Sequence, residues 1–253
     1  MTGRTIAFGD IHGCSKPLRT LIETIQPTSD DTLIFLGDYI DRGADSRGVI
    51  DLLIELKSKC NLIPLLGNHE IMFLGVICGG MADHIWMMCG GSATLVSYGG
   101  ALHHVPQSHI DFLKQCRPYW EDDQHICVHA CYLPDQPMDQ LGEQHLFWEH
   151  LTPVCPLPHH SGKRVIVGHT PQANHEVLDH GHLVCLDTYC FGGGWLTAFD
   201  LHSGDVWQAN RHGHMRRQMG KVIAQRFVTL SRYLFRKSAT NQATARSQDG
   251  PQS

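Results

Sequence analysis

Short apolar runs alternate with amphipathic stretches over the first seventy residues of the chain. Thr5–Phe8, Thr32–Leu36 and Asn61–Leu66 are brief and largely apolar, which is typical of buried strands. Between them, Ser15–Ile25 and Val49–Lys57 place apolar side chains at helical spacing. Because strands and helices alternate, the pattern predicts βαβ units and a largely parallel sheet.

The rest of the chain is less regular. Residues 71–120 predict a mostly helical region broken by glycine pairs. Five short apolar runs then follow, and the closing ones are separated only by turn residues, which favours antiparallel pairing and a mixed sheet. The runs expected as strands are Gln124–Val128, Arg164–Val167, Leu183–Leu186, Leu196–Asp200 and Val206–Ala209.

The composition is that of an ordinary globular protein, with 42% hydrophobic and 18% charged residues. No apolar run approaches the roughly 18 residues of a membrane-spanning helix, and the first ten residues lack an apolar signal core. A cytoplasmic location is therefore expected. The ten cysteines form no Cys-x-x-Cys pair, which favours reduced, buried thiols over a disulfide framework.

Polar side chains follow the ends of successive predicted strands. The first three loops read GDIHG (9–13), GDYIDRG (37–43) and GNHE (67–70), and His129 and Gly168-His169-Thr170 follow later strands. Loops beyond the carboxyl ends of strands are the usual place for a site in such a sheet. Carboxylate, imidazole and amide donors suit Mn, Fe or Zn, and two such ions about 3.5–4 Å apart can activate a water.

The ordered motifs resemble those of the phosphoprotein phosphatase family of metallophosphoesterases. The separations also agree, with 28 residues from Asp10 to Asp38 and 30 from Asp38 to Asn68. The resemblance extends from about residue 5 to residue 209, and residues 90–99 are similar to the short bacterial branch, the serine/threonine protein phosphatase type. It implies an α/β fold, a four-layer αββα metallophosphoesterase sandwich with mixed sheets and a di-metal site at one edge.

The resemblance also implies roles for the motif residues. Two divalent metal ions, Mn first and Fe or Zn as alternatives, would bridge a hydroxide that attacks phosphorus in line. Arg42 would hold a phosphate oxygen, and His69, oriented by Asp41, would protonate the leaving oxygen. The metal ligands would be Asp10 and His12 on the first ion, Asp38 between both, and Asn68, His129 and His169 on the second.

The sequence departs from the family pattern at two places. The second phosphate-binding arginine expected after His-Ala is absent, and residues 146–150 (LFWEH) occupy its position. Either His150 substitutes in part, or Arg42 and the metals hold the phosphate alone; Arg117 and Arg164 are remote candidates. Tyr189 stands where many relatives have glycine, and it either lines the substrate cleft or packs within its loop.

Charge divides the chain near residue 210. Residues 1–210 contain 11 of the 20 Lys and Arg and 24 of the 25 Asp and Glu, whereas residues 211–253 contain nine basic residues and one acidic residue. We therefore expect a catalytic domain over 1–210 and a basic extension over 211–253. A basic amphipathic helix is predicted over about 221–237, before a disordered tail. It would dock on the acidic domain, contact a membrane peripherally, or bind an acidic partner; nucleic acid is not expected.

Three functions remain open on the sequence. The first is a serine/threonine protein phosphatase, with phosphotyrosine as a further substrate, acting on phosphoproteins or phosphopeptides. The second is a bis(5'-nucleosyl)-tetraphosphatase or another nucleotide phosphohydrolase. Asp41 and Glu70 favour the phosphatase, because the symmetrical nucleotide hydrolases usually lack that aspartate and carry Gly-Asn-His-Asp. The third, an inactive phosphate-binding module, is disfavoured because all the expected ligands and His69 are present.

Overall fold

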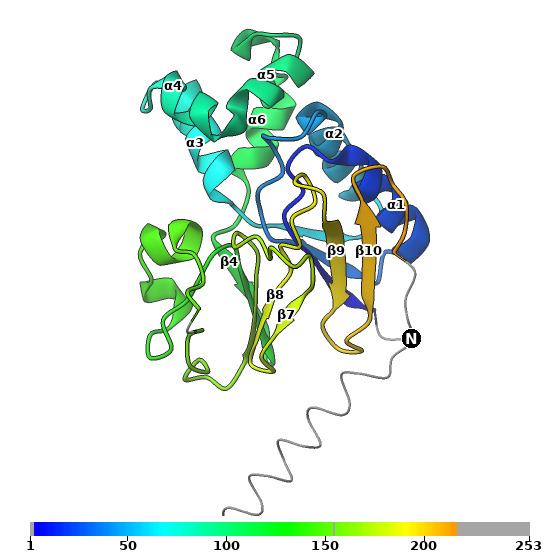
Figure 1. Ribbon diagram of the computed structural model, residues 1–253, viewed down its shortest axis with the longest axis vertical. Coiled ribbons are helices and arrows are strands. Elements are labelled where there is room, and N and C mark those ends of the chain that lie inside the picture. The colour runs from blue at the N-terminus through cyan, green and yellow to red at the C-terminus, as the bar shows by residue number, and fades with distance from the viewer. Residues whose placement is uncertain (1–2, 154, 217–253) are drawn as a thin grey trace, which may run out of the picture. The chain divides into compact units, whose positions relative to one another are not determined.

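The structure is a computed structural model that describes residues 3–153 and 155–216. The predicted basic helix over 221–237 and the tail after it lie outside the described residues. Two five-stranded sheets make up the centre of the described chain (Figure 1). No helix among the described residues is long and apolar enough to cross a membrane.

The first sheet contains the predicted βαβ units. Its strands are ordered β10-β9-β1-β2-β3, and β1, β2 and β3 are parallel. β9 runs antiparallel to both β1 and β10, which confirms a mixed sheet. The elements are β1 (Thr5–Phe8), α1 (Ser15–Ile25), β2 (Thr32–Phe35), α2 (Ser46–Leu56), β3 (Asn61–Pro64), β9 (Trp195–Asp200) and β10 (Val206–Asn210).

The second sheet has the order β4-β5-β6-β8-β7. Residues 183–186 were expected to belong to an antiparallel run, and this is confirmed at one edge only: β8 pairs antiparallel with β7 in a short hairpin, but it is parallel to its other neighbour, β6. β4 and β7 are two or three residues long, too short for an apolar pattern to reveal. The strands are β4 (Tyr119–Glu121), β5 (His125–Val128), β6 (Arg164–Val167), β7 (Leu178–Asp179) and β8 (Leu183–Cys185).

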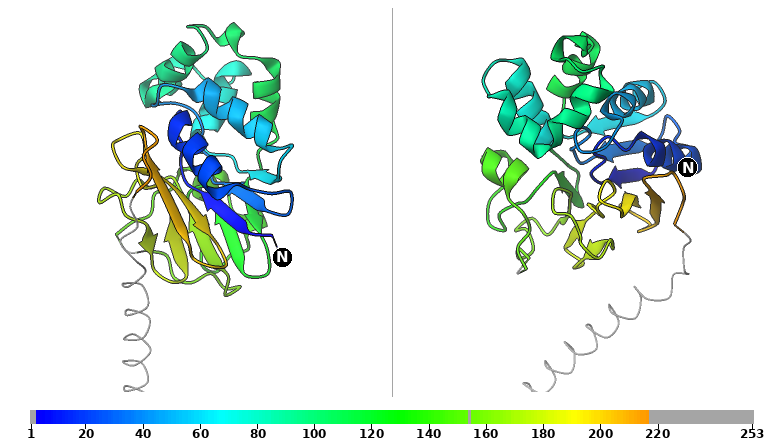
Figure 2. Two further views of the ribbon diagram at one scale, coloured as in Figure 1. Left: turned by 90° about the vertical axis from the view of Figure 1, so that its right-hand side faces the viewer. Right: turned by 45° about the horizontal axis from the view of Figure 1, so that its top comes forward.

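A helical segment lies between β3 and β4 in sequence, as predicted for residues 71–120, and it gathers at one end of the strands (Figures 1 and 2). The GNHE motif, expected as a loop, is instead the N-terminal turn of α3, because Gly67 ends the preceding extended stretch and the Glu70 carboxylate accepts the backbone N–H of Gly67 at 3.1 Å. The helices are α3 (Asn68–Ile77), α4 (Asp83–Trp86), α5 (Ser92–Ser97) and α6 (Gln107–Lys114), with a π-helical turn at Met87–Gly91 between α4 and α5.

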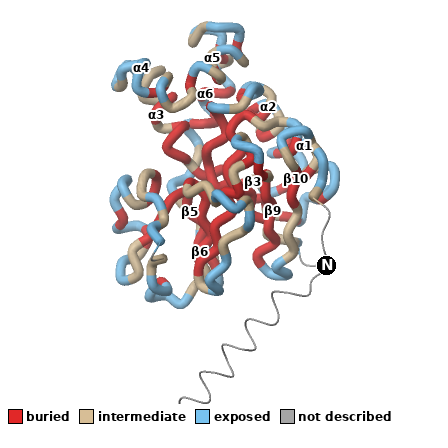
Figure 3. Tube along the Cα trace, in the orientation of Figure 1, coloured by how far each residue is buried: buried red, intermediate tan, exposed pale blue. Residues whose placement is uncertain are grey.

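Alternation along the strands builds the layers. In the first sheet, Phe8 and Phe35 face the core shared with α1 and α2, whereas Ala7 and Ile34 face the second sheet. Val184 of β8 lies in that same inter-sheet core. The outer face of the second sheet packs against the short helical turns Met138–Gln140 and Gln144–Trp148 and their loops. The four-layer α/β arrangement is thus present, and Figure 3 shows the strands as its most buried part.

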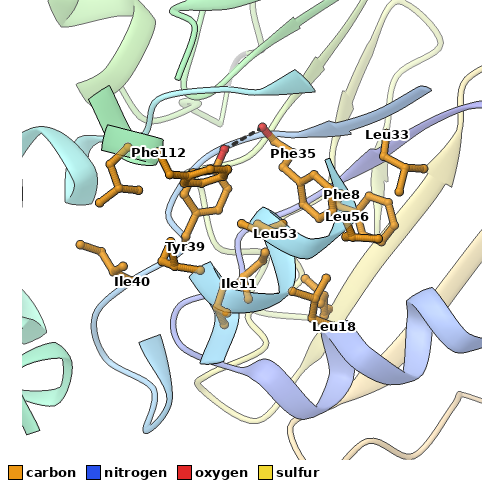
Figure 4. Close-up of a cluster of buried hydrophobic side chains, with 14 of the residues drawn as sticks. Phe8, Ile11, Leu18, Leu33, Phe35, Tyr39, Ile40, Leu53, Leu56 and Phe112 are labelled. Carbon is orange, nitrogen blue, oxygen red and sulfur yellow. Dashed lines mark hydrogen bonds between the residues drawn. The ribbon is translucent and has the colours of Figure 1, made fainter. Parts of the chain in front are cut away.

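The core on the helical side extends beneath the second motif loop (Figure 4). Phe8 and Phe35 stack with ring centroids 4.4 Å apart. Tyr39, inside the GDYIDRG loop, is fully buried, and its hydroxyl donates to the carbonyl of Phe35 (3.2 Å). The loop is therefore anchored from within by an aromatic side chain, while its carboxylates remain free for other contacts.

Candidate metal and phosphate site

The carboxyl ends of five strands bring the predicted ligands together. Asp10 follows β1, Asp38 follows β2, Asn68 follows β3, His129 follows β5 and His169 follows β6. All five side chains are at most 8% exposed. The site therefore draws on both sheets, and the sandwich sets the distances between its ligands.

Asp38 is the centre of the cluster. Its carboxylate oxygens lie 3.5 Å from Nε2 of His12 and 3.4 Å from Nε2 of His129. Asp38 belongs to two groups of possible metal ligands. The ligand atoms of His12, Asp38 and His69 lie within 4.8 Å of one another, and so do those of Asp38, His129 and His169. This is the geometry expected of a carboxylate between two adjacent cations.

Asn68 and Asp10 border these two groups. Oδ1 of Asn68 lies 3.2 Å from Nε2 of His129. The carboxylate of Asp10 accepts the backbone N–H of His169 at 3.0 and 3.1 Å. The structure thus brings together all six residues that the sequence proposed as metal ligands.

The three histidines of the proposed cage are arranged as metal ligands should be. Each donates one ring N–H to a backbone carbonyl, which fixes its tautomer and leaves the lone pair on the other nitrogen; at His12 that nitrogen lies 3.2 Å from Nη1 of Arg42. Burial lowers the pKa of His12 and His129, and it lowers the pKa of His169 to about 3, so all three imidazoles are neutral. The acceptors are the carbonyls of Ile40 (3.0 Å) for His12, Leu36 (2.8 Å) for His129 and Trp148 (3.1 Å) for His169.

The site also contains more negative charge than its neighbours neutralise. Asp187, which the sequence did not single out, is buried near Asp10 and Asp38. Burial and the Asp38 charge raise the pKa of Asp187 to about 7, and burial with Asp187 and Asp38 raises the pKa of Asp10 well above its ordinary value. Buried carboxylates grouped in this way require cations. The donor set and its charge both fit divalent metal ions.

Left-handed backbone is concentrated at the site. Positive φ is uncommon for residues other than glycine and typically costs about 1–3 kcal/mol, so it persists only where neighbouring contacts enforce it. Among the described residues, eight that are not glycine have positive φ, and six of these are residues proposed for the site. They are His12 (45°), Asp38 (51°), Asp41 (71°), Arg42 (66°), His169 (61°) and Tyr189 (63°).

Glu70 enforces the shape of the 37–43 loop. Its fully buried carboxylate accepts the backbone N–H groups of Asp38 and Tyr39, both at 2.8 Å, and that of Gly67 at 3.1 Å. The glycine itself allows close approach, because a Cβ on Gly67 would lie 2.3 Å from Oδ1 of Asp38. One side chain of α3 therefore holds the loop that carries the central carboxylate.

His69 is held by Asp41. Nδ1 of His69 lies 2.7 Å from Oδ2 of Asp41, and Nε2 lies 3.9 Å from the carboxylate of Asp38. Burial lowers the pKa of His69, but the two carboxylates outweigh it and hold that pKa above its ordinary value. The imidazole therefore has one nitrogen directed toward the metal cluster and the other fixed by an anion.

Two donors from the helical segment hold Asp41 in turn. Nε1 of Trp86 donates to Oδ2 at 2.8 Å, and the hydroxyl of Thr94 donates to Oδ1 at 2.6 Å. The backbone N–H of Arg42 donates to the carbonyl of Gly90 at 3.2 Å. Trp86 and Thr94 were not predicted as site residues, since nothing in their local sequence reveals a partner 45 or 53 positions away.

The residues predicted to bind the phosphate or the substrate do not all lie near the cluster. The exposed Arg42 lies over the ring of Phe191, with 4.8 Å from its guanidinium carbon to the ring centroid. His150 is exposed and stacks on His169 with centroids 4.2 Å apart, so the structure places it beside the cluster. Tyr189 packs edge-on against Phe191 at 4.9 Å. Arg164, in contrast, is paired with Asp179 at the start of β6, the end opposite His169.

The fold and this cluster define a metal-binding hydrolase of the phosphoesterase class. Residues 3–201 match the family described as calcineurin-like phosphoesterase, and the chain belongs to that family. The family uses divalent metal ions, in agreement with the His and Asp clusters at the strand ends. Solved structures of protein phosphatases are among those that share this fold.

Comparisons with known proteins point to more than one substrate class. A symmetrical bis(5'-nucleosyl)-tetraphosphatase from Nitrosomonas europaea is 28% identical over 142 residues, which cover 54% of this chain and 47% of the relative. The chain thus spans about half the length of that curated relative. A solved structure assigned as a diadenosine tetraphosphatase has a TM-score of 0.63 at 24% identity, covering 83% of this chain and 94% of that one.

A serine/threonine phosphatase from Saccharomyces cerevisiae has a TM-score of 0.58 at 14% identity, covering 87% of this chain and 82% of that one. At these identities the two structural matches establish the fold alone. The family match assigns the chain to the calcineurin-like phosphoesterases, and its reaction and substrate have to be argued from the site.

Proposed function

We propose that this chain hydrolyses phosphomonoesters with alkoxide leaving groups, and foremost phosphoserine and phosphothreonine in proteins. The observation that carries the proposal is the His69–Asp41 pair, with 2.7 Å between Nδ1 and Oδ2. An alkoxide is a poor leaving group, so its departure needs a proton from a positioned acid. A phosphate or nucleotide leaving group is stable as an anion and needs no such acid.

The proposed roles follow from the positions of the side chains. When bound to Asp10, His12, Asp38, Asn68, His129 and His169, two divalent ions would supply an activated water and neutralise the phosphate. Arg42, lying on the ring of Phe191, holds a phosphate oxygen at the exposed side of the cluster. His69, as the imidazolium that donates its Nδ1–H to Asp41, gives its Nε2 proton to the departing oxygen and becomes neutral; the Asp41 carboxylate stabilises the cationic form.

His150 and Tyr189 are proposed to line the substrate side. His150 covers His169 from solvent and offers a ring nitrogen where the expected second arginine is absent. Tyr189 and Phe191 form an aromatic wall beside Arg42. With one guanidinium rather than two, phosphate binding relies more heavily on the metal ions, and Mn is the proposed native metal, with Fe or Zn as alternatives.

Hydrolysis of dinucleoside polyphosphates is the second candidate. The relative from Nitrosomonas europaea is named for that activity, and the aromatic wall formed by Tyr189 and Phe191 could stack on a purine base. The two candidates differ in the leaving group, and so in their need for His69.

A substrate panel tests the proposal. The full chain would be stripped with a chelator, reloaded with Mn, Fe, Zn or Mg in turn, and assayed on phosphoserine, phosphothreonine and phosphotyrosine peptides and on diadenosine tetraphosphate. The proposal expects kcat/KM on the phosphoserine or phosphothreonine peptides to exceed that on the dinucleotide at least tenfold. A preference for the dinucleotide would replace the proposal by the second candidate.

A further inference from the structure

A second group of imidazole and carboxylate donors lies away from the proposed catalytic cluster. Asp122 belongs to the turn between β4 and β5, His125 is the first residue of β5, and His202 belongs to the turn between β9 and β10. One ligand atom from each residue lies within 4.8 Å of the others. Since β5 leads from His125 to His129, the group is at the opposite end of that strand from the catalytic cluster.

The three donors come from different sheets. Asp122 and His125 belong to the β4–β5 hairpin of the second sheet, and His202 belongs to the β9–β10 hairpin of the first. In Figure 1 the turn joining β9 and β10 lies at the bottom of the strands, whereas the helical segment from α3 to α6 lies at the top. A ligand bound by all three residues would join the two sheets at this end.

Each turn is fixed without help from a ligand. Oδ1 of Asp122 accepts the backbone N–H groups of Gln124 (2.8 Å) and His125 (2.7 Å). In the other turn, the buried carboxylate of Asp200 accepts the backbone N–H of His202 at 2.9 Å. The donors are therefore held in place by their own hairpins, which is what a pre-formed binding site requires.

The rings are close and available. The centroids of His125 and His202 are 5.4 Å apart with their planes at 70°, and Nδ1 of His125 lies 3.3 Å from Oδ1 of Asp122. His125 is 5% exposed, whereas His202 is exposed. Within residues 3–153 and 155–216, no hydrogen bond engages the ring nitrogens of His202, so either nitrogen can bind a metal ion.

We propose that Asp122, His125 and His202 form a further divalent metal site, separate from the catalytic cluster. Two neutral imidazoles and one carboxylate are a donor set for Zn²⁺ and its neighbours Co²⁺ and Ni²⁺, with water completing the coordination. The Asp122–His125 contact alone is a local pair three residues apart. The third donor, from a hairpin of the other sheet, turns that pair into a site that bridges the sandwich.

Zinc stoichiometry tests the site. The full chain would be stripped with a chelator and dialysed against Zn²⁺, and bound metal per chain would be measured together with the Zn²⁺-dependent rise in melting temperature. We expect the His202→Ala variant to bind one equivalent less than the wild type and to lose most of the Zn²⁺-dependent rise that remains once the catalytic ions are bound. Its hydrolysis of phosphoester should match that of the wild type.

Two further variants complete the experiment. His84→Ala removes an exposed histidine that lies in none of the donor groups, and it should keep the wild-type stoichiometry. His125→Gln should lose the same equivalent as His202→Ala. Equal zinc content in the wild type and His202→Ala would overturn the site. A failure of the proposed function would leave the one-equivalent difference between the wild type and His202→Ala unchanged, so the two proposals fail separately.

Discussion

Nδ1 of His69 lies 2.7 Å from Oδ2 of Asp41, and both side chains are shielded from solvent. The carboxylate accepts the Nδ1–H and stabilises the imidazolium, whose second proton, on Nε2, faces the cluster. We expect His69→Asn to retain both metal ions and to lose roughly 10²–10⁴-fold in rate on phosphoserine peptides. The loss on p-nitrophenyl phosphate, whose leaving group needs no proton, should be much smaller. Equal losses on both substrates would argue against an acid role for His69.

Trp86 and Thr94, which donate hydrogen bonds to Asp41, should affect the reaction rate by keeping Asp41 in position beside His69. Thr94→Val keeps the shape of the side chain but removes the hydroxyl that donates to Oδ1 of Asp41 at 2.6 Å. Loss of a group that orients a functional side chain typically costs about 10–100-fold in activity, and here kcat on the peptide should fall by that order with KM nearly unchanged. Thr24→Val, at an exposed position of α1, is the matched control. A change confined to KM would place Thr94 in substrate binding instead.

Removal of the central charge should empty the catalytic cluster. Asp38 lies within 4 Å of a ring nitrogen of His12, His69 and His129, so Asp38→Asn removes the anion that two cations would share. We expect activity to disappear and metal bound at this cluster to fall, while the proposed site at Asp122, His125 and His202 keeps its zinc. Metal content and turnover near the wild-type values would contradict the assignment of Asp38.

Stability should depend on pH through Asp31. Hydrogen bonds from the Arg4 side chain hold the pKa of Asp31 well below its usual range, and Asp31 also accepts the backbone N–H groups of Arg4 and Thr28. A depressed pKa in the folded state contributes stability above the unfolded pKa of about 4, and that stability is lost as the pH falls below it.

Asp31→Asn should therefore lower the free energy of unfolding by roughly 1–2 kcal/mol at pH 7, given the partly exposed Arg4 partner. Urea unfolding at pH 7 and near pH 3 measures the difference, which should shrink at the lower pH. Asp30→Asn, at the exposed neighbouring position, should unfold like the wild type at both. A difference independent of pH would point to packing rather than charge.

The hydrophobic pattern predicted the parallel strands of the first sheet because period and length there agree with local propensity. The pattern did not predict features that depend on contacts between distant segments of the chain. The parallel pairing of β8 depends on its neighbour β6, and the helical start at Asn68 depends on the hydrogen bond from the backbone N–H of Gly67 to Glu70. The motifs located the proposed ligands, but not Asp187, Trp86 or Phe191, whose roles exist only once distant segments meet.

The carboxylate of Glu70 accepts the backbone N–H groups of Gly67, Asp38 and Tyr39, so the contacts that hold this part of the loop come from within the protein. The unusual backbone of the 37–43 loop should therefore not depend on a bound metal ion. Loading with metal should leave the hydrogen-exchange protection of these amides unchanged. A phosphoester would then meet a surface that is already in its working conformation, and reorganisation would add little to the activation barrier.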